Sequence, residues 1–200
     1  MSTLLQISSS LQGEVGHSSQ LANRFARQWR ERHPDGRVVQ RDLAVEPVPH
    51  LDAERFQALI TAADQRSDIQ REIAAYSDAL IAEINAADAI ALGLPLYNFG
   101  IPSTLKAYFD HIARAGVTFR YTANGPEGLI QDKPVYIFAA RGGRYAGTAA
   151  DSQTQFVRQF LNFIGLRDLH FVYAEGLNID AQTRTDALAQ AERDIQTLVA

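Results

Sequence analysis

The sequence predicts an α/β protein in which a parallel sheet carries helices on both faces. Short apolar runs alternate along the chain with longer segments whose apolar residues recur at helical spacing. One of these runs, Ala87–Leu92, is almost entirely apolar, as expected for a central strand covered on both faces. No internal repeat or low-complexity segment interrupts the alternation. These observations together favour a doubly wound α/β architecture.

Length and composition indicate one globular domain over residues 1–200. The chain has 46% hydrophobic and 21% charged residues, which is typical of a folded domain. A net charge of -4 argues against broad binding to nucleic acid or an anionic membrane. The absence of cysteine excludes disulfides, thiolate metal sites and cysteine nucleophiles. Because the first residues lack the features of a signal peptide, we expect a cytoplasmic protein.

Five strands are expected, and the second of them is the weakest and is expected at an edge. Their ranges are Thr3–Ile7, Arg37–Asp42, Ala87–Leu92, Val135–Ala140 and Leu169–Ala174. Five helices are expected between and after these strands. Their apolar stripes are Leu21, Phe25 and Trp29; Ile69, Ile73, Tyr76, Leu80 and Ile84; Leu105, Tyr108, Phe109 and Ile112; Phe156, Phe160, Phe163 and Ile164; and Leu188, Ala191, Ile195 and Leu198.

Several details of these elements follow from single residues. Ser18 or Ser19 is expected to cap the first helix, and Gly165 to close the fourth. The segment 43–63 is expected to be irregular because it contains Pro47 and Pro49. Phe109, Phe156 and Phe160 are expected in the core, since they lie at helical spacing.

The sequence leaves the order of the strands in the sheet open. In doubly wound sheets, however, ligands bind beyond the carboxyl ends of the strands, where the strand order reverses. The loops after the first, third and fourth strands are therefore the expected places for chemistry.

The first of these loops, residues 8–19, is rich in serine and leads directly into a helix. Hydroxyl groups and free backbone N–H groups at a helix start favour a bound phosphate. The chain has neither the glycine pattern of dinucleotide-binding folds nor that of a P-loop, so a mononucleotide is the expected guest. The alternative is that a serine caps the helix and the other serines only fill the loop.

The second and third loops each have a feature that suits a flat ring. Residues 94–102 form a Pro–aromatic–polar–aromatic–Gly run, which offers a rigid stacking surface, although it could also fold onto the core or form an interface. Residues 140–147 contain two adjacent glycines, which let backbone N–H groups approach a ligand, although they could also form a plain turn. Residues 116–128 form an insertion that is longer than a simple turn, and such loops are usually functional or interfacial.

These loops, taken together, resemble those of the FMN-dependent NADH-azoreductases and the related NAD(P)H:quinone oxidoreductases. The resemblance covers essentially the whole chain, and its most specific block is residues 114–129. The other segments that carry it are 8–19, 95–102, 106–110 and 141–143. It implies a flavodoxin-like three-layer sandwich with strand order 2-1-3-4-5, a homodimer, and FMN bound near the dimer interface.

The resemblance also implies a set of binding residues. The FMN phosphate would be held by Ser10, Gly16, His17 and Ser18; the ribityl chain and ring by Pro95, Leu96, Tyr97, Asn98 and Phe99; and the pyrimidine end by Ala140, Arg141, Gly142 and Gly143. The acceptor pocket would contain Asn98, Phe99, Phe119, Tyr121 and Phe163, some of them from a partner subunit. Many members carry serine where this chain has Gly16, so the phosphate here would lose one hydroxyl contact. Members also often carry methionine where this chain has Leu96, and this change conserves the volume of the side chain.

The implied activity is ping-pong transfer of hydride from NADH or NADPH through tightly bound FMN to quinones and azo compounds. No catalytic triad or carboxylate pair is evident, and none is required when a flavin carries the chemistry. The five histidines lack metal-ligand spacing, so no metal site is expected, and His111 is expected on the helix surface. Two alternatives remain open: a flavin-binding electron carrier or regulator, and a module that binds another phosphate compound.

Overall fold

The central sheet has five parallel strands in the order β2-β1-β3-β6-β7. The computed structural model describes residues 2–198 of the chain. The strands of the sheet are β1 (Thr3–Ser8), β2 (Arg37–Asp42), β3 (Ala89–Pro95), β6 (Val135–Ala140) and β7 (Leu169–Ala174). Counted within this sheet, their order is the predicted 2-1-3-4-5, with the weak second strand at an edge, so the predicted fold is confirmed.

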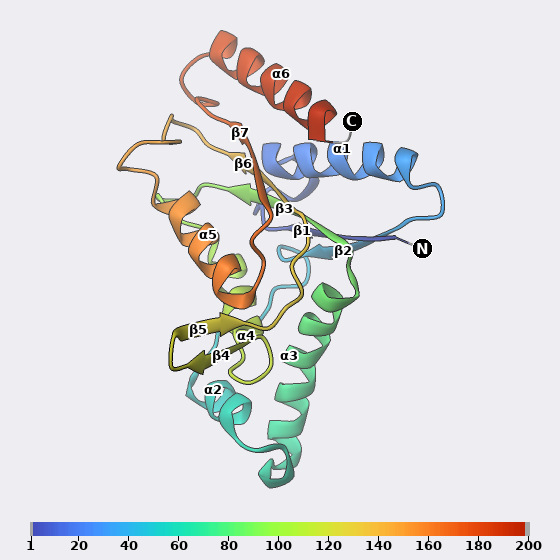
Figure 1. Cartoon of the computed structure of the whole chain (residues 1–200). Helices are drawn as coiled ribbons and strands as arrows, with labels where there is room; N and C mark the ends of the chain where they lie inside the picture. The colour runs from blue at the N-terminus through green and yellow to red at the C-terminus, as the bar shows by residue number, and fades with distance from the viewer. Residues whose placement is uncertain (1, 199–200) are drawn as a thin grey trace.

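Helices cover both faces of the sheet, which gives a three-layer sandwich (Figure 1). On one face lie α1 (His17–Arg32) and α6 (Ala181–Leu198). On the other lie α3 (Asp68–Ala86), α4 (Ser103–Ile112) and α5 (Ser152–Ile164). A short helix, α2 (Ala53–Ile60), packs on α3, and two 3₁₀ turns, η1 (Gly13–Val15) and η2 (Ala63–Gln65), complete the helical elements of residues 2–198.

Two hydrophobic cores fill the spaces between these layers. Leu4 and Phe138 point from the sheet towards Phe25 of α1, while Leu5 and Ile137 point towards the opposite helices. This is the alternation of side chains that a strand produces when both of its faces are buried. The cores hold the strands rigidly and leave the loops at their ends free to carry function.

The insertion at 116–128 contains a hairpin that the sequence did not predict as strands. Its strands are β4 (Phe119–Thr122) and β5 (Gly125–Gly128). The hairpin packs tightly against the end of α5. The contact is so close that a Cβ at Gly128 would lie 2.2 Å from the backbone nitrogen of Gly165. Gly165 itself adopts φ +114 as the predicted C-cap of α5. The helix α2 was also missed, because the prolines that precede it suggested an irregular segment.

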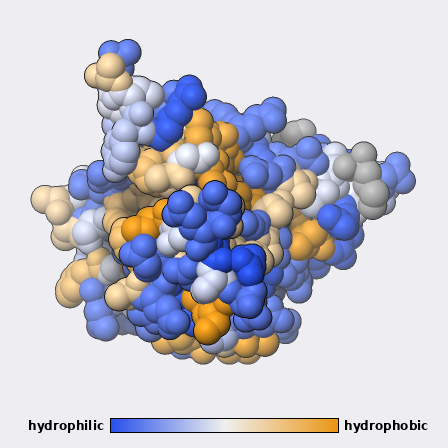
Figure 2. Space-filling view, turned by 90° about the horizontal axis from the view of Figure 1, so that it is seen from below, coloured by the Kyte–Doolittle hydropathy of each residue, from blue (hydrophilic) through white to orange (hydrophobic). Residues whose placement is uncertain are grey.

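Two predictions about side-chain orientation were wrong. In α3 the expected apolar stripe is buried only towards its carboxyl end, and Ile69 is 60% exposed because the start of the helix extends beyond the sheet. His111 is buried instead of lying on the surface, and its ring is within hydrogen-bonding distance of the carbonyl of Pro49. Figure 2 shows the face that contains α2 and α3, where hydrophobic residues are visible in patches among hydrophilic ones.

None of the described helices is long and apolar enough to cross a membrane. No described group of three or more His, Asp or Glu side chains could hold a metal ion.

Candidate functional site

A hollow lies where the carboxyl ends of β1, β3 and β6 meet, at the edge of the sheet that the strand order predicts for a ligand. Its volume is about 140 Å³. It is lined by Ser10, Gln12, Gly16, His17, Ser18, Pro95, Leu96, Tyr97, Ala140, Arg141, Gly142, Leu177 and Asn178. The structure thus brings the first, second and third loops together, as the sequence predicted.

The start of α1 forms the polar wall of this hollow. Gly16 is the N-cap of the helix, and no side chain caps the backbone N–H groups of the first turn. The Oγ atom of Ser18 and the Nδ1 atom of His17 are buried without a hydrogen-bond partner among the described residues. The expectation that Ser18 or Ser19 caps the helix was therefore wrong, since both lie inside its first turn. A helix start with unpaired donors attracts an anion.

Gly16 and Ser10 fit each other closely. A Cβ at Gly16 would lie 2.2 Å from the Oγ of Ser10, so the serine hydroxyl occupies the space that a side chain at position 16 would need. The backbone of Gly16 has φ -66 and ψ 136, which any residue can adopt. With Ser10 placed as it is in this chain, glycine is favoured at position 16 by the close approach of Ser10 and not by the backbone conformation.

The second loop forms an aromatic surface next to this wall. We call residues 95–100 the shelf. The hydroxyl of Tyr97 accepts a hydrogen bond from the backbone N–H of Leu11 at 3.1 Å and lies 3.3 Å from the Oγ of Ser10. A second hollow of about 600 Å³ adjoins the first and shares Leu96 and Tyr97 with it. The two hollows together form one depression, narrow beside the start of α1 and broader along the shelf.

The tip of the shelf has a strained backbone. Asn98 has φ +48 and Phe99 has φ +64, and no other described non-glycine residue has positive φ. Each such residue costs on the order of 1–3 kcal/mol, and this kind of strain collects at functional sites. The strain turns the ring of Phe99 outwards, where it is 64% exposed and meets the edge of Tyr145 with the ring centres 6.0 Å apart.

The third loop contributes backbone to the site, while its arginine side chain points inwards. The Arg141 side chain is fully buried and forms ion pairs with Asp151 at 3.1 Å and Glu175 at 3.0 Å. Burial raises the pKa of Asp151, but hydrogen bonds from Thr154 and Arg141 outweigh it, and the pKa lies below its usual value. The Arg141 side chain is thus fully engaged within the fold, and its backbone borders the hollow.

Comparison with known proteins agrees with this geometry. Residues 2–199 match the model of a family described by its flavodoxin-like fold. An FMN-dependent NADH:quinone oxidoreductase of Cellvibrio japonicus is 61% identical over 100% of both chains. One of Alcanivorax borkumensis is 52% identical, covering 96% of this chain and 97% of its own. The chain belongs to this family.

A solved structure supports the same assignment. The azoreductase from Bacillus anthracis str. Sterne superposes with a TM-score of 0.89 and 28% identity, covering 98% of each chain. The resemblance predicted from the sequence is therefore confirmed, with FMN-dependent quinone oxidoreductases and azoreductases both among the similar proteins.

The structure also identifies lining residues of this family member that sequence reasoning missed. Leu177 and Asn178 follow β7 and line the first hollow. The amide of Asn178 is close to Gly142, because a Cβ there would lie 2.6 Å from the Asn178 side-chain nitrogen. The sequence contained a signal for these residues, because all parallel strands end at the same edge of the sheet and the loop after the fifth strand must therefore lie near the other loops. The prediction included only the loops after the first, third and fourth strands.

The residues expected in the acceptor pocket lie in two separate places within one chain. Asn98 and Phe99 lie on the shelf, whereas Phe119 packs on Phe163, with ring centres 4.3 Å apart, and Tyr121 is 76% exposed. Beside Phe163 lies an apolar hollow of about 510 Å³. Phe109 is buried in the core as expected, while Phe156 and Phe160 are partly buried: they pack against the core, Phe160 stacking on Phe109 with ring centres 4.1 Å apart, and also line this hollow.

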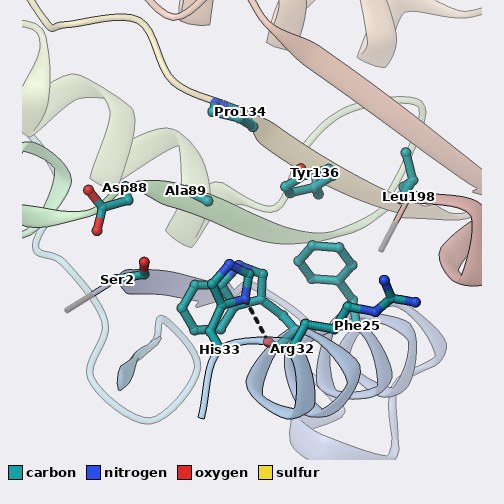
Figure 3. Close-up of a pocket in the computed structure, with 10 residues that line it drawn as sticks. Ser2, Phe25, Arg32, His33, Asp88, Ala89, Pro134, Tyr136 and Leu198 are labelled. Carbon is teal, nitrogen blue, oxygen red and sulfur yellow. Dashed lines mark hydrogen bonds between the residues drawn. The ribbon is translucent and has the colours of Figure 1, made fainter. Parts of the chain in front are cut away.

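A further cavity lies at the opposite end of the sheet. Its volume is about 320 Å³, and Figure 3 shows it between the end of α1 and the start of β3. Its walls include Phe25, Trp29, His33, Asp88 and Tyr136. Two polar groups there have partners within the fold: the ring nitrogen of His33 lies 2.8 Å from the carbonyl of Trp29, and Asp88 accepts from the N–H of Thr3. Unlike the first hollow, this cavity has no described lining residue with a buried side-chain polar atom that lacks a partner.

Proposed function

We propose that this chain is an FMN-dependent NADH:quinone oxidoreductase that also reduces azo compounds. The observation that carries the proposal is the uncapped start of α1, where buried polar atoms of His17 and Ser18 have no partner, beside the shelf around Tyr97. A phosphate group would supply the missing acceptors, and a flat ring would occupy the shelf. The names of the relatives and of the solved azoreductase support the reaction.

The polar end of the site fits the phosphate of FMN. Ser10 and the first turn of α1 line the hollow, where the Ser18 hydroxyl and the first backbone N–H groups of the helix lack partners and would donate to the phosphate. Gly16 lets Ser10 approach, and so the hydroxyl of Ser10 occupies the place of a side chain at position 16. We propose Ser10, Gly16, His17 and Ser18 as the phosphate-binding residues.

The broader end of the site fits the ring. We propose that Pro95, Leu96, Tyr97, Asn98 and Phe99 support the ring and ribityl chain, while the backbone of Ala140, Arg141, Gly142 and Gly143 borders the pyrimidine edge. The carbonyl groups of Gly142 and Gly143 accept hydrogen bonds from Asn178 and Gly176, which fixes this loop close to the hollow. Backbone N–H groups held there would stabilise negative charge on the ring edge.

When bound, FMN supplies the hydride chemistry, accepting electrons from NADH and passing them to the acceptor. The chain itself would position the cofactor and shield one side of its ring. The phosphate-binding turn fixes one end of the cofactor, and the shelf covers one side of the ring. The exposed ring of Phe99 then forms a wall against which a planar quinone or azo compound can stack. Because donor and acceptor would use the same place in turn, a ping-pong mechanism follows.

We further propose a homodimer in which the acceptor pocket is completed across the interface. Phe119, Tyr121 and Phe163 lie away from the shelf of their own chain, beside the apolar hollow that Phe156 and Phe160 line. Exposed apolar surface of this kind marks an interaction site. Two copies related by twofold symmetry would cover both hollows and bring these aromatics to the partner's shelf. The whole chain, 1–200, would act as one FMN-binding domain in the cytoplasm, where NADH is available.

The test is a steady-state and anaerobic study of the purified protein. We expect a yellow protein that NADH bleaches under nitrogen and that a quinone or an azo dye turns yellow again. Double-reciprocal plots against NADH at several quinone concentrations should be parallel. Intersecting lines would contradict the shared place for donor and acceptor. A yellow protein that neither NADH nor NADPH reduces would instead indicate an electron carrier, and failure to bind added FMN would indicate a module for another phosphate compound.

A further inference from the structure

The start of α5 holds the strained shelf from below. The side-chain nitrogen of Gln153 donates to the carbonyls of Pro95 at 2.8 Å and Gly100 at 3.2 Å. The hydroxyl of the neighbouring Ser152 donates to the carbonyl of Phe99 at 2.5 Å. Three carbonyls of the shelf are therefore bound by two adjacent side chains of one helix. A backbone with two consecutive residues at positive φ persists only where its surroundings hold it, and these contacts do so.

Arg141 determines which way the amide of Gln153 faces. The Nε of Arg141 donates to the side-chain oxygen of Gln153 at 3.2 Å. Because a guanidinium can only donate, the oxygen of the amide must face Arg141 and its NH₂ group must face the shelf. Gln153 is only 1% exposed, so water does not compete for either end.

The same guanidinium also holds the third loop. It pairs with Glu175 at 3.0 Å, and that carboxylate accepts hydrogen bonds from the backbone N–H groups of Tyr145 and Ala146, both at 2.9 Å. Asp151, its other ion-pair partner, caps α5 by accepting from the N–H of Thr154. One buried cation is thus linked to the third loop on one side and, through Gln153, to the shelf on the other.

We propose that Gln153 is a positioning residue of the flavin site, which sets the distance and tilt of the shelf relative to the third loop through Arg141. The inference depends on the proposed function for the identity of the ligand, but its first test measures how firmly the backbone of the shelf is held in the chain without ligand. Gln153 touches neither hollow, so it acts on the ligand only through the backbone of Pro95 and Gly100.

The decisive substitution is Gln153→Glu, which keeps the shape and the oxygen that faces Arg141. It replaces the donor with an oxygen, which repels the two carbonyls of the shelf. Gln155→Glu is the matched control, because it makes the same change two residues further along α5 at an exposed position. Gln153→Met, which is neutral and of similar length, removes the donor without adding charge and carries the test if Gln153→Glu does not fold.

We expect backbone amides of residues 96–101 to exchange with solvent faster in the FMN-free Gln153→Glu protein than in wild type. The dissociation constant for FMN, measured by quenching of flavin fluorescence, should rise about tenfold, as the loss of a buried donor predicts. The absorption bands and midpoint potential of bound FMN should shift, which a merely less stable fold would not produce. Gln155→Glu should match wild type in all of these measurements.

The proposal is overturned if Gln153→Glu and Gln153→Met bind FMN within twofold of wild type with unchanged exchange at the shelf. It is also overturned if both lose only thermal stability while the bound-FMN spectrum and potential stay the same. A wild-type protein that does not bind FMN would contradict the proposed function alone. In that case the exchange experiment on the FMN-free chain still decides whether Gln153 holds the shelf.

Discussion

The two ends of the sheet both contain cavities, and they differ in how their polar groups are satisfied. The cavity at the amino end, near Trp29 and Tyr136, has a volume of about 320 Å³, whereas the hollow beside α1 has about 140 Å³ and adjoins one of about 600 Å³. At the amino end His33 and Asp88 pair within the fold, and none of the described residues that line this cavity has a buried side-chain polar atom without a partner. At the carboxyl end Ser18 and His17 keep buried polar atoms without partners. Buried polar atoms without a partner at the start of α1 therefore distinguish the end where we propose that the cofactor binds.

The direction of α1 explains this difference. The helix begins at the carboxyl end of β1, so its unpaired N–H groups and the positive end of its dipole face the first hollow. Its last turn arrives at the amino end, where the N–H of His33 closes on the carbonyls of Trp29 and Arg30. Because β1 and β2 are parallel, the connection between them must return the chain to the amino end of the sheet, so α1 runs opposite to the strands. The first turn of α1 thus offers unpaired N–H groups to an anion, whereas carbonyls of its last turn accept hydrogen bonds from the chain itself.

Shortening the Trp29 side chain in the wall of the amino-end cavity should have the largest effect, and this effect should be on stability alone. Trp29 is 6% exposed and stacks on His33 with ring centres 4.2 Å apart. Trp29→Ala should lower the free energy of unfolding by about 3–5 kcal/mol, as loss of a buried aromatic does. Denaturant unfolding measures this loss, and Trp29→Phe should show a smaller one. The comparison between the two ends breaks if Trp29→Ala also changes the FMN dissociation constant of the folded protein by more than twofold.

A charge placed in the phosphate-binding turn should have the next largest effect, this time on binding. Ser18→Asp puts a carboxylate where the FMN phosphate is proposed to lie. Repulsion between charges at about 4 Å in partly screened surroundings should raise the dissociation constant about a hundredfold or more. The readout is a fluorescence titration of the FMN-free protein.

Ser67→Asp is the control for this charge. Ser67 is an ordinary N-cap, whose hydroxyl accepts from the N–H of Gln70, and aspartate caps a helix equally well. Its FMN affinity should equal that of wild type. If Ser18→Asp also binds FMN normally, the phosphate lies elsewhere and the uncapped start of α1 is not the site.

The smallest effect should appear in the response of stability to pH at the carboxyl end. Hydrogen bonds lower the pKa of Asp151 in the folded chain, so its contribution to stability is complete above its ordinary value of 3.8. That contribution is lost as the pH falls through the lowered, folded-state value. Asp151→Asn should therefore be less stable than wild type at neutral pH, and the difference should shrink in acid. A difference that stays constant from neutral pH to pH 3 would contradict this account.

The sequence allowed most of the fold to be predicted because its strands and helices differ clearly in apolar period. Arg37–Asp42, Val135–Ala140 and Leu169–Ala174 were predicted with the bounds that the structure has. The hairpin at 119–128 was missed, because β4 and β5 are largely exposed and lack an apolar period. The prediction for Phe156 and Phe160 was correct in part: they pack against the core but also line an open hollow, since helical spacing shows which residues share a face but not what covers that face.

By itself, the sequence determined that three loops should meet at the carboxyl edge of a parallel sheet, and that they contain serines, an aromatic run and paired glycines. These are local features, and chain direction in a doubly wound sheet brings them together. Only the tertiary structure decided how they are held. Asn98 and Phe99 at positive φ, the inward turn of Arg141 and the amide of Gln153 beneath the shelf depend on contacts between residues far apart in the chain. No local pattern encodes such contacts, because burial and hydrogen-bond geometry arise only when the elements pack.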